Sequence, residues 1–409
     1  MSRPNVFFLA IDSLRADAIS GNSVPTPNID AYAARGAAFR QAICTTTTTT
    51  PSFSSMLTGR YPPHHGVRGL QGYRLAPSAT TMAEVFGKAG YSTHAEVTGP
   101  LLPETGILRG FEEAKHRPGY KSPFFGWRDE VIERMGSYVD PWFMLLHIWE
   151  VHRPYRSPPD FEKRKDKAGY EASVAATDDY LKPVFEAAGD NTIVVITGDH
   201  GEGYPESQLG FYAVKGARKA RRVLKLGKWL PGLDNKLAER EIGHGFALYE
   251  HLVRVPLIIA GPGVTSHVID DQVRHIDLFP TLADLCGVEA PPGMDGRSLR
   301  PLMEGRSLPG EPAYLEAVGV KLGGNRILGV RTPDWKLLKR GNGRVSLYKL
   351  NGGAAPDEKR NLYRRHPEVA EQLEAVMEKI TSSEAVAESG MTSEEEEVVE
   401  QHLKDLGYL

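Results

Sequence analysis

The chain has very little cysteine, since only Cys44 and Cys286 occur among its 409 residues. Two cysteines exclude a disulfide framework and a cysteine metal cluster, and they are typical of a reducing compartment. Long apolar runs are also missing. The one near the N-terminus extends no further than residues 6–12, which is too short for a signal sequence or a membrane span. We therefore expect a cytoplasmic protein.

The chain also lacks an excess of charge of either sign. It has 49 Lys and Arg residues and 52 Asp and Glu residues, which gives a formal net charge of −3 and a pI near 6.5. This balance lacks the positive excess of nucleic-acid-binding proteins, so any anion binding must be local. We expect no nucleic-acid partner.

Four short apolar runs stand out, and none alternates polar with apolar residues. They cover residues 6–11, 142–148, 192–197 and 255–259. Such runs are typical of strands buried on both faces, as in a parallel sheet covered by helices. Helical patterns lie between them, at residues 27–34 and, after a capping box of Thr81 and Glu84, at residues 82–89. The alternation predicts an α/β fold with a central, mostly parallel sheet.

The pattern changes near residue 306, where short alternating segments predict a small antiparallel sheet and a following helix from Pro367 to about Ile380. We predict a catalytic domain at 1–305, a small C-terminal α+β subdomain at 306–381, and a linker with a helical tail at 382–409. The tail ends in an apolar tip. We expect this tip to dock on the body of the protein or on a second subunit of a homo-oligomer.

Polar side chains gather where the predicted strands end, and open α/β sheets bind ligands at the carboxyl ends of their strands. They are Asp12 after the first run, Asp199 and His200 after the third, and His147, Glu150 and His152 in or after the second. Asp12, Asp199 and His200 together would form a mixed oxygen and nitrogen site suited to Ca, Mg, Mn or Zn.

Six consecutive threonines, residues 45–50, precede Pro51. Proline is favoured as the first residue of a helix, so the last threonines should stand at a helix N-terminus. Backbone N–H groups there, with the helix dipole, favour a tetrahedral anion such as phosphate or sulfate. A metal ion beside such a threonine would activate its hydroxyl as a nucleophile. The spacing alone equally allows a strand followed by an ordinary helix cap.

Several segments, taken in order, resemble the sulfatase-type branch of the alkaline phosphatase superfamily over nearly the whole chain. They include IDSLRAD, TPNIDAYAARGAAF, PSFSSMLTGRYPPHHGV, HIWEVHRPY, TGDHGE and HGFALYEHLVRVPLI. The resemblance implies an alkaline-phosphatase-like fold and one divalent metal ion held by Asp12, Thr49, Asp199 and His200. It also implies that His152 and His244 contact the transferring group or protonate the leaving group. With Glu150, these two histidines could instead hold a second metal ion.

The chain departs from that pattern at the nucleophile. Sulfatases carry the motif Cys-x-Pro-Ser-Arg, in which the cysteine is oxidised to formylglycine. Alignment on Pro51 places Thr49 at the position of this nucleophile and Phe53 at the position of the arginine. Thr48 and Thr50, one residue away on either side, stay open as alternative nucleophiles. The departures continue at Ser13, in place of a metal-binding aspartate, and at Thr98, in place of a sulfate-binding lysine. Related phosphodiesterases and lipid phosphotransferases use threonine. The resemblance thus favours a hydrolase or transferase of phosphate esters, whose substrate would be a phosphodiester or a phosphonate monoester.

Two other functions stay open: a sulfatase that works without formylglycine, and a catalytically inactive module that binds anions or membranes. An insert at 204–242 contains a basic amphipathic segment, residues 211–233, with seven Lys or Arg residues and no acid. Such segments are typical of helices on anionic membrane surfaces, which would make the substrate a lipid or a polymeric anion. A solvated lid helix is the alternative.

Overall fold

The computed structural model describes residues 3–19, 24–117, 126–158, 161, 169–203, 244–319, 326–353, 358–383 and 390–408. The predicted insert at 204–242 lies outside the described residues. In the described part of the chain, no helix is long and apolar enough to cross a membrane.

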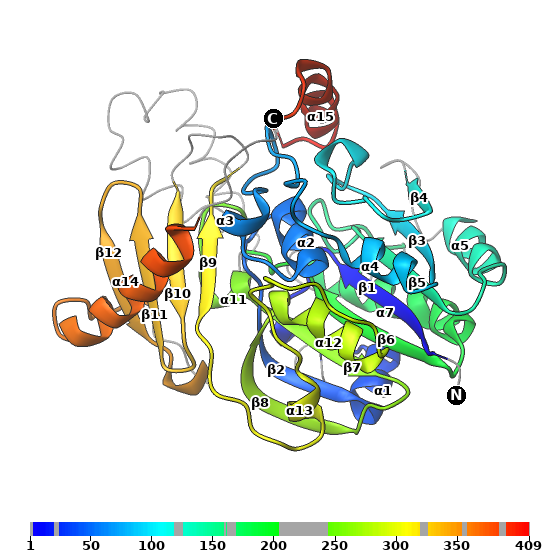
Figure 1. Cartoon of the computed structure of the whole chain (residues 1–409), viewed down its shortest axis with the longest axis horizontal. Helices are drawn as coiled ribbons and strands as arrows, with labels where there is room; N and C mark the ends of the chain where they lie inside the picture. Colours follow the sequence, from blue (N-terminus) through cyan, green and yellow to red (C-terminus); the bar gives the residue numbers. More distant parts are fainter. Residues whose placement is uncertain are drawn as a thin grey trace.

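An eight-stranded sheet forms the centre of the molecule, in the order β4-β3-β5-β1-β6-β7-β2-β8 (Figure 1). Its central strand, β1 (Asn5–Ile11), pairs in parallel with β5 (Trp142–Ile148) and β6 (Thr192–Gly198). The prediction of a mostly parallel sheet is confirmed. Of the four predicted strands, β7 (Arg254–Ala260) is the exception, because it runs antiparallel to both β6 and β2. The remaining strands are β2 (Ala37–Ile43), β3 (Ser92–Val97), β4 (Glu113–His116) and β8 (His267–Arg274).

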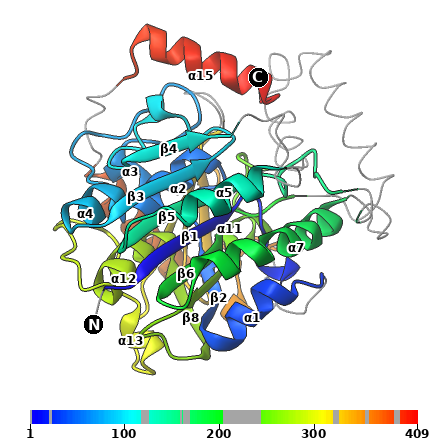
Figure 2. The same ribbon diagram turned by 90° about the vertical axis from the view of Figure 1, so that its right-hand side faces the viewer.

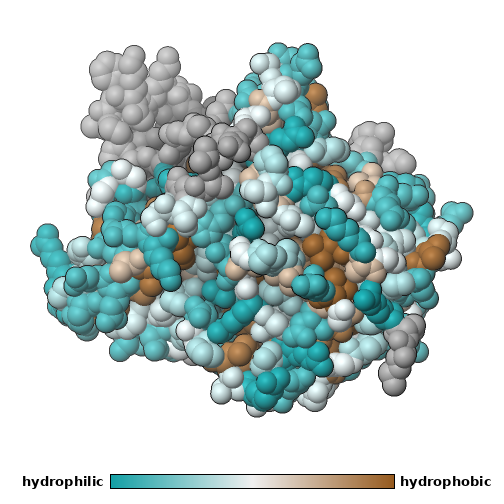
Figure 3. Space-filling model, in the orientation of Figure 1, coloured by the Kyte–Doolittle hydropathy of each residue, from teal (hydrophilic) through white to brown (hydrophobic). Residues whose placement is uncertain are grey.

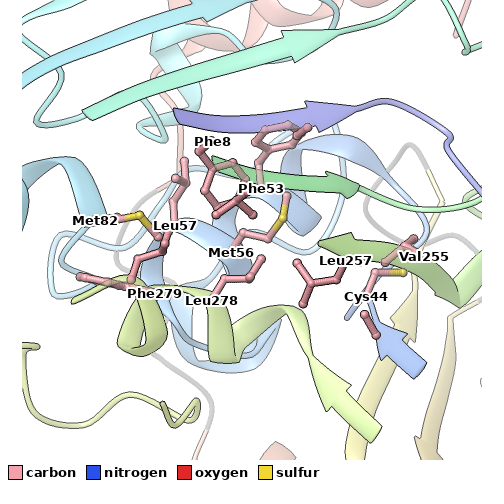
Figure 4. Close-up of a cluster of buried hydrophobic side chains, with 14 of the residues drawn as sticks. Phe8, Cys44, Phe53, Met56, Leu57, Met82, Val255, Leu257, Leu278 and Phe279 are labelled. Atoms are coloured by element: carbon pink, nitrogen blue, oxygen red, sulfur yellow. The ribbon is translucent and has the colours of Figure 1, made fainter. Parts of the chain in front are cut away.

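Helices cover both faces of this sheet (Figure 2). Side chains alternate across a strand, so Val6, Phe8 and Ala10 of β1 enter one apolar core while the residues between them enter the other. Figure 4 shows Phe8 of the first core close to Phe53 and Met56 of α2. That core also contains residues of α4 and α12, whereas α1, α5 and α7 contribute to the second. The bounds are α1 Pro27–Arg35, α2 Thr49–Thr58, α4 Met82–Lys88, α5 Arg128–Met135, α7 Tyr170–Ala188 and α12 Leu278–Leu285.

Helix starts follow the predicted signals with one correction. The capping box of α4 is present, since the Thr81 hydroxyl accepts from the Glu84 N–H at 3.2 Å. Helix α2, however, begins at Thr49 and not at Pro51. Thr48 has an extended backbone (φ −139°, ψ 144°) and serves as the N-cap residue. Proline fits inside the first turn because N–H groups there have no intrahelical acceptor.

The predicted small antiparallel sheet and its helix are also present, at one end of the molecule (Figure 1). The strands are β9 (Ala313–Ala317), β10 (Ile327–Arg331), β11 (Trp335–Arg340) and β12 (Val345–Lys349), and α14 (Pro367–Thr381) packs on them. The Glu316 N–H donates to the Thr45 carbonyl at 2.9 Å, so this sheet touches the threonine run.

The last helix, α15 (Ser393–Asp405), docks on the body of the protein, one of the two predicted arrangements. It lies above β3 and β4 in Figure 2, and Leu403 and Val399 pack against Leu70 and Leu102. Hydrophilic residues cover most of the face shown in Figure 3. The short helices are α3 (Pro62–His65), α11 (Glu250–Val253) and α13 (Arg300–Met303).

Candidate active site

The four predicted metal ligands meet at the carboxyl ends of β1 and β6 and at the N-terminus of α2. The hydroxyl of Thr49 donates to Asp12 Oδ2 at 3.2 Å and lies 3.3 Å from His200 Nε2. His200 Nε2 is also 3.3 Å from Asp199 Oδ2. All four side chains are buried. The fold therefore brings together residues that are up to 188 positions apart in the sequence.

Ser13 orients both carboxylates of this group. Its N–H donates to Asp199 Oδ1 at 3.0 Å, and its hydroxyl donates to Asp12 Oδ1 at 2.8 Å. Its φ of 62° lies in the left-handed region, which for a residue other than glycine costs about 1–3 kcal/mol. The hydrogen bonds from Ser13 to Asp12 and Asp199 thus hold the strained turn after β1, and the same bonds position the two carboxylates.

His147, which the sequence analysis placed at this edge of the sheet but not among the metal ligands, joins the group as a ligand candidate. It lies in β5 beside Ala10 of β1, and its Nε2 is 3.5 Å from Asp12 Oδ2. Its Nδ1 is 3.1 Å from the Thr98 carbonyl, an acceptor, so Nδ1 carries the proton and Nε2 presents a lone pair. The available signal was weak, a single titratable side chain in the apolar run WFMLLHI.

The cluster suits a divalent cation. Among the described residues, His147 Nε2 and Asp199 Oδ2 are buried without a hydrogen-bond partner. Ligand atoms of Asp12, His147 and Asp199 all lie within 4.8 Å of one another. Burial and the negative charge of Asp12 raise the pKa of Asp199. For Asp12, the neighbouring histidines outweigh the effect of burial and hold its pKa below the usual range. A metal ion would satisfy the orphaned atoms and relieve the repulsion between the carboxylates.

His152 and His244 lie beside this cluster. The ring centroid of His244 is 4.3 Å from that of His200 and 4.9 Å from that of His152. His244 Nδ1 lies 3.6 Å from the buried carboxylate of Glu202, and this neighbour outweighs burial and lowers the pKa of Glu202 to about 2. Burial lowers the pKa of His152 to about 4, so its imidazole is neutral at pH 7.

The structure does not support the second metal site considered for Glu150, His152 and His244. Both carboxylate oxygens of Glu150 accept from the guanidinium of Arg117 at 2.8 Å, and both side chains are buried. A buried carboxylate that is paired with a buried arginine is already neutralised, and among the described residues the group placed to share a metal ion is Asp12, His147 and Asp199. Glu150 therefore stabilises the loop after β5.

Two other threonines of the run, Thr47 and Thr50, have structural contacts. The hydroxyl of Thr50 donates to the Pro100 carbonyl at 3.1 Å, and that of Thr47 to the Ala247 carbonyl at 3.1 Å. Cys44 is buried in the core near Val255 and Leu257 (Figure 4), and burial raises the pKa of its thiol well above the ordinary value. Cys44 is thus an inert core residue.

His65 anchors α2 from the far side of the site and gives a testable pH dependence. Its Nδ1 accepts from the Val67 N–H at 3.1 Å, and its Nε2 lies 3.0 Å from the Ser55 hydroxyl. Burial disfavours the charged imidazolium and, with the nearby charges of His64 and Arg68, lowers its pKa from 6.5 to about 3. The folded state therefore binds fewer protons than the unfolded state between these values, and stability is lost as the pH falls below 6.5.

We expect His65→Asn to reduce the slope of unfolding free energy against pH, between pH 6 and 4, by about 1.4 kcal/mol per pH unit. Urea denaturation at several pH values measures this slope. Ser55→Ala is the matched control, since it removes the hydrogen-bond partner but keeps the titrating group, and it should shift the curve without changing its slope. An unchanged slope in His65→Asn would refute this role of His65.

Two family models match this chain. The family model described as "Sulfatase" matches residues 4–288, and the model "N-sulphoglucosamine sulphohydrolase, C-terminal" matches residues 244–384. The uncharacterized sulfatase YidJ of Escherichia coli (strain K12) is 24% identical over 362 residues, which cover 75% of this chain and 73% of that protein.

Solved structures agree on the fold. The phosphonate monoester hydrolase of Agrobacterium radiobacter superposes with a TM-score of 0.74 at 17% identity, over 96% of this chain and 99% of that one. The protein BT4656, solved in complex with its substrate D-glucosamine-2-N,6-O-disulfate, superposes with a TM-score of 0.70 at 18% identity, over 95% and 100% of the two chains. The family model covers well over half of the chain, so the predicted resemblance is confirmed. This chain belongs to the sulfatase family of ester hydrolases.

Proposed function

We propose that this protein is a metal-dependent hydrolase of phosphate esters with Thr49 as its nucleophile. The substrate that we propose is a phosphodiester or a phosphonate monoester. The observation that carries the proposal is the position of the Thr49 hydroxyl at the N-terminus of α2, where it is within hydrogen-bond distance of Asp12 and His200. Cys44, the cysteine nearest in sequence, is buried in the apolar core. A threonine nucleophile is the chemistry that these two placements support together.

Asp12, Asp199, His200 and Thr49, together with His147, would hold the divalent ion. When bound, such an ion supplies positive charge that lowers the pKa of a neighbouring hydroxyl and stabilises charge on the transferring group. Asp12 Oδ2 accepts the hydrogen bond of the Thr49 hydroxyl and so orients it, and with the metal ion bound this hydroxyl can lose its proton to solvent before it attacks. The N–H groups of the first turn of α2 are positioned to donate to the anion.

His152 and His244 border the cluster on the side where we place the leaving group. Attack in line with the departing oxygen leaves the phosphoryl group on Thr49. Water then releases it in a hydrolase, and an acceptor alcohol releases it in a transferase. Hydrolysis and transfer use the same residues until the phosphoryl group is released from Thr49.

The departures from the sulfatase pattern favour phosphorus over sulfur. Phe53 stands at the position of the expected arginine and packs its ring against His147, with the centroids 5.0 Å apart. The hydroxyl of Thr98, at the position of the expected lysine, donates to the Arg117 carbonyl at 3.2 Å. Neither residue brings positive charge to a sulfate group. The similarity to a phosphonate monoester hydrolase supports the same choice.

A sulfatase without formylglycine is the second candidate. It is supported by the relative named a sulfatase and by the structural neighbour solved with a sulfated sugar. An inactive anion-binding module is the third, and the buried, orphaned ligand atoms of Asp199 and His147 oppose it.

A substrate panel separates these candidates. We expect purified protein, supplied in turn with Ca, Mn, Mg and Zn, to hydrolyse bis-nitrophenyl phosphate or nitrophenyl phenylphosphonate with a higher kcat/KM than nitrophenyl phosphate or nitrophenyl sulfate. Release of nitrophenol measures all four rates on one scale. Turnover of the sulfate ester without activity on any phosphorus ester would contradict the proposal. An inactive protein without bound metal would support the binding module.

A further inference from the structure

The C-terminal helix carries a tyrosine to the edge of the active site. Leu403 and Met391 pack with Leu70 and Leu102, and Tyr408 packs against the same cluster. His402 Nε2 lies 2.9 Å from the Gly99 carbonyl, to which it donates. Figure 2 shows α15 lying along the body of the molecule. The position of Tyr408 is therefore set by a docked helix.

The phenol of Tyr408 is hydrogen-bonded to His152. The distance from the Tyr408 hydroxyl to His152 Nε2 is 2.8 Å, and the ring centroids are 5.6 Å apart. The other ring nitrogen, Nδ1, lies 2.5 Å from the Arg153 carbonyl. A carbonyl only accepts, so Nδ1 carries the proton of the neutral imidazole, and Nε2 accepts from the phenol.

This arrangement leaves His152 without an N–H for a substrate. Its one proton is used by the Arg153 carbonyl, and burial lowers its pKa to about 4, so a second proton is absent at pH 7. The phenol keeps its own proton, because removal from solvent raises the pKa of Tyr408 well above the ordinary value. The Tyr408 O–H donates to His152 Nε2 in this arrangement, and rotation about the phenol C–O bond can redirect it to another acceptor.

We propose that Tyr408 is a catalytic residue that donates a hydrogen bond to the leaving-group oxygen, with His152 holding the phenol in place when no substrate is bound. The proposal rests on the proposed function, since it assumes an ester whose leaving group lies beside His152. No proton needs to be transferred from the phenol. A neutral, preorganised donor stabilises negative charge as it develops on the leaving oxygen. The benefit should therefore grow with the basicity of the leaving group.

The test compares Tyr408→Phe with the unchanged protein on a series of esters, from nitrophenyl to phenyl to alkyl leaving groups. We expect kcat/KM for nitrophenyl esters to change less than about threefold and kcat/KM for alkyl esters to fall about 10- to 100-fold, which steepens the dependence on leaving-group basicity. Gln401→Ala is the control on the same helix, because Gln401 is exposed and its side chain donates to Asp405 alone among the described residues. A uniform loss across the series would overturn the proposal.

A second measurement is independent of turnover. The ring nitrogens of His152 can be followed by ¹⁵N NMR, where we expect Tyr408→Phe to shift the Nε2 resonance towards that of an imidazole nitrogen without a donor. Leu403→Asp, which should release α15 from its apolar cluster, is expected to give the same shift. An unchanged Nε2 resonance in Tyr408→Phe overturns the contact. If no ester is hydrolysed by the unchanged protein, the proposed function fails, while this spectrum still decides the contact.

Discussion

Replacing Thr49 by alanine should lower kcat/KM by about 10³-fold or more on whichever ester the protein hydrolyses best, since removal of a nucleophile leaves only binding and electrostatic contributions. The protein should stay folded, because the Thr49 hydroxyl contacts Asp12 and His200 and no other group among the described residues. Initial rates and thermal unfolding measure the two effects separately.

Neighbouring threonines provide the controls. Thr50→Ala removes a hydroxyl that donates to the Pro100 carbonyl, so it should reduce activity far less than Thr49→Ala. Thr49→Ser keeps a hydroxyl in place and should recover part of the lost rate. If Thr50→Ala or Thr48→Ala abolished turnover while Thr49→Ala did not, the nucleophile would be one residue away from our assignment.

Loss of the metal is the second large effect that we expect. Asp199→Asn and His147→Ala should each reduce bound divalent metal, from about one ion per chain, by at least tenfold, and activity should fall with it. Metal analysis of the purified protein measures the binding directly. The physical reason is the pair of buried atoms, Asp199 Oδ2 and His147 Nε2, that have no hydrogen-bond partner among the described residues.

A matched control is Asp178→Asn, which changes a buried aspartate that accepts hydrogen bonds from Asn28 and Ile29, away from the site. It should keep its metal. Added metal should also raise the unfolding temperature of the unchanged protein, because an ion present at 100 times its Kd stabilises the folded state by about 2.7 kcal/mol. Full metal content in both site variants would place the ion elsewhere.

Local patterns predicted most of the framework. Strands β1, β5 and β6 were readable because a strand buried on both faces is a continuous apolar run, and α4 because its capping box lies within four residues. The direction of β7 was not readable, since the same apolar run serves a parallel or an antiparallel neighbour. Strand direction depends on the connection, which is a property of the whole chain.

The site was predictable where a motif lies at a strand end and unpredictable where a contact joins distant residues. Asp12, Asp199 and His200 follow strands directly. His147 lies inside a strand, where a single histidine resembles a core residue, and only the carbonyl of Thr98, 49 residues away, reveals its tautomer. Tyr408 lies 256 residues from His152, so no local pattern joins them.

The most direct test of the central claim is to find the transferred group on the protein. After a quench in acid during turnover of a phenylphosphonate ester, tryptic peptide 41–60 should carry the mass of one phenylphosphonyl group. Fragmentation should place that group on Thr49, although seven threonines share the peptide. A modified Thr49 supports the nucleophile and the phosphorus ester together. Modification of any other residue, or an unmodified peptide under conditions where nitrophenol is released in a burst, would contradict the claim.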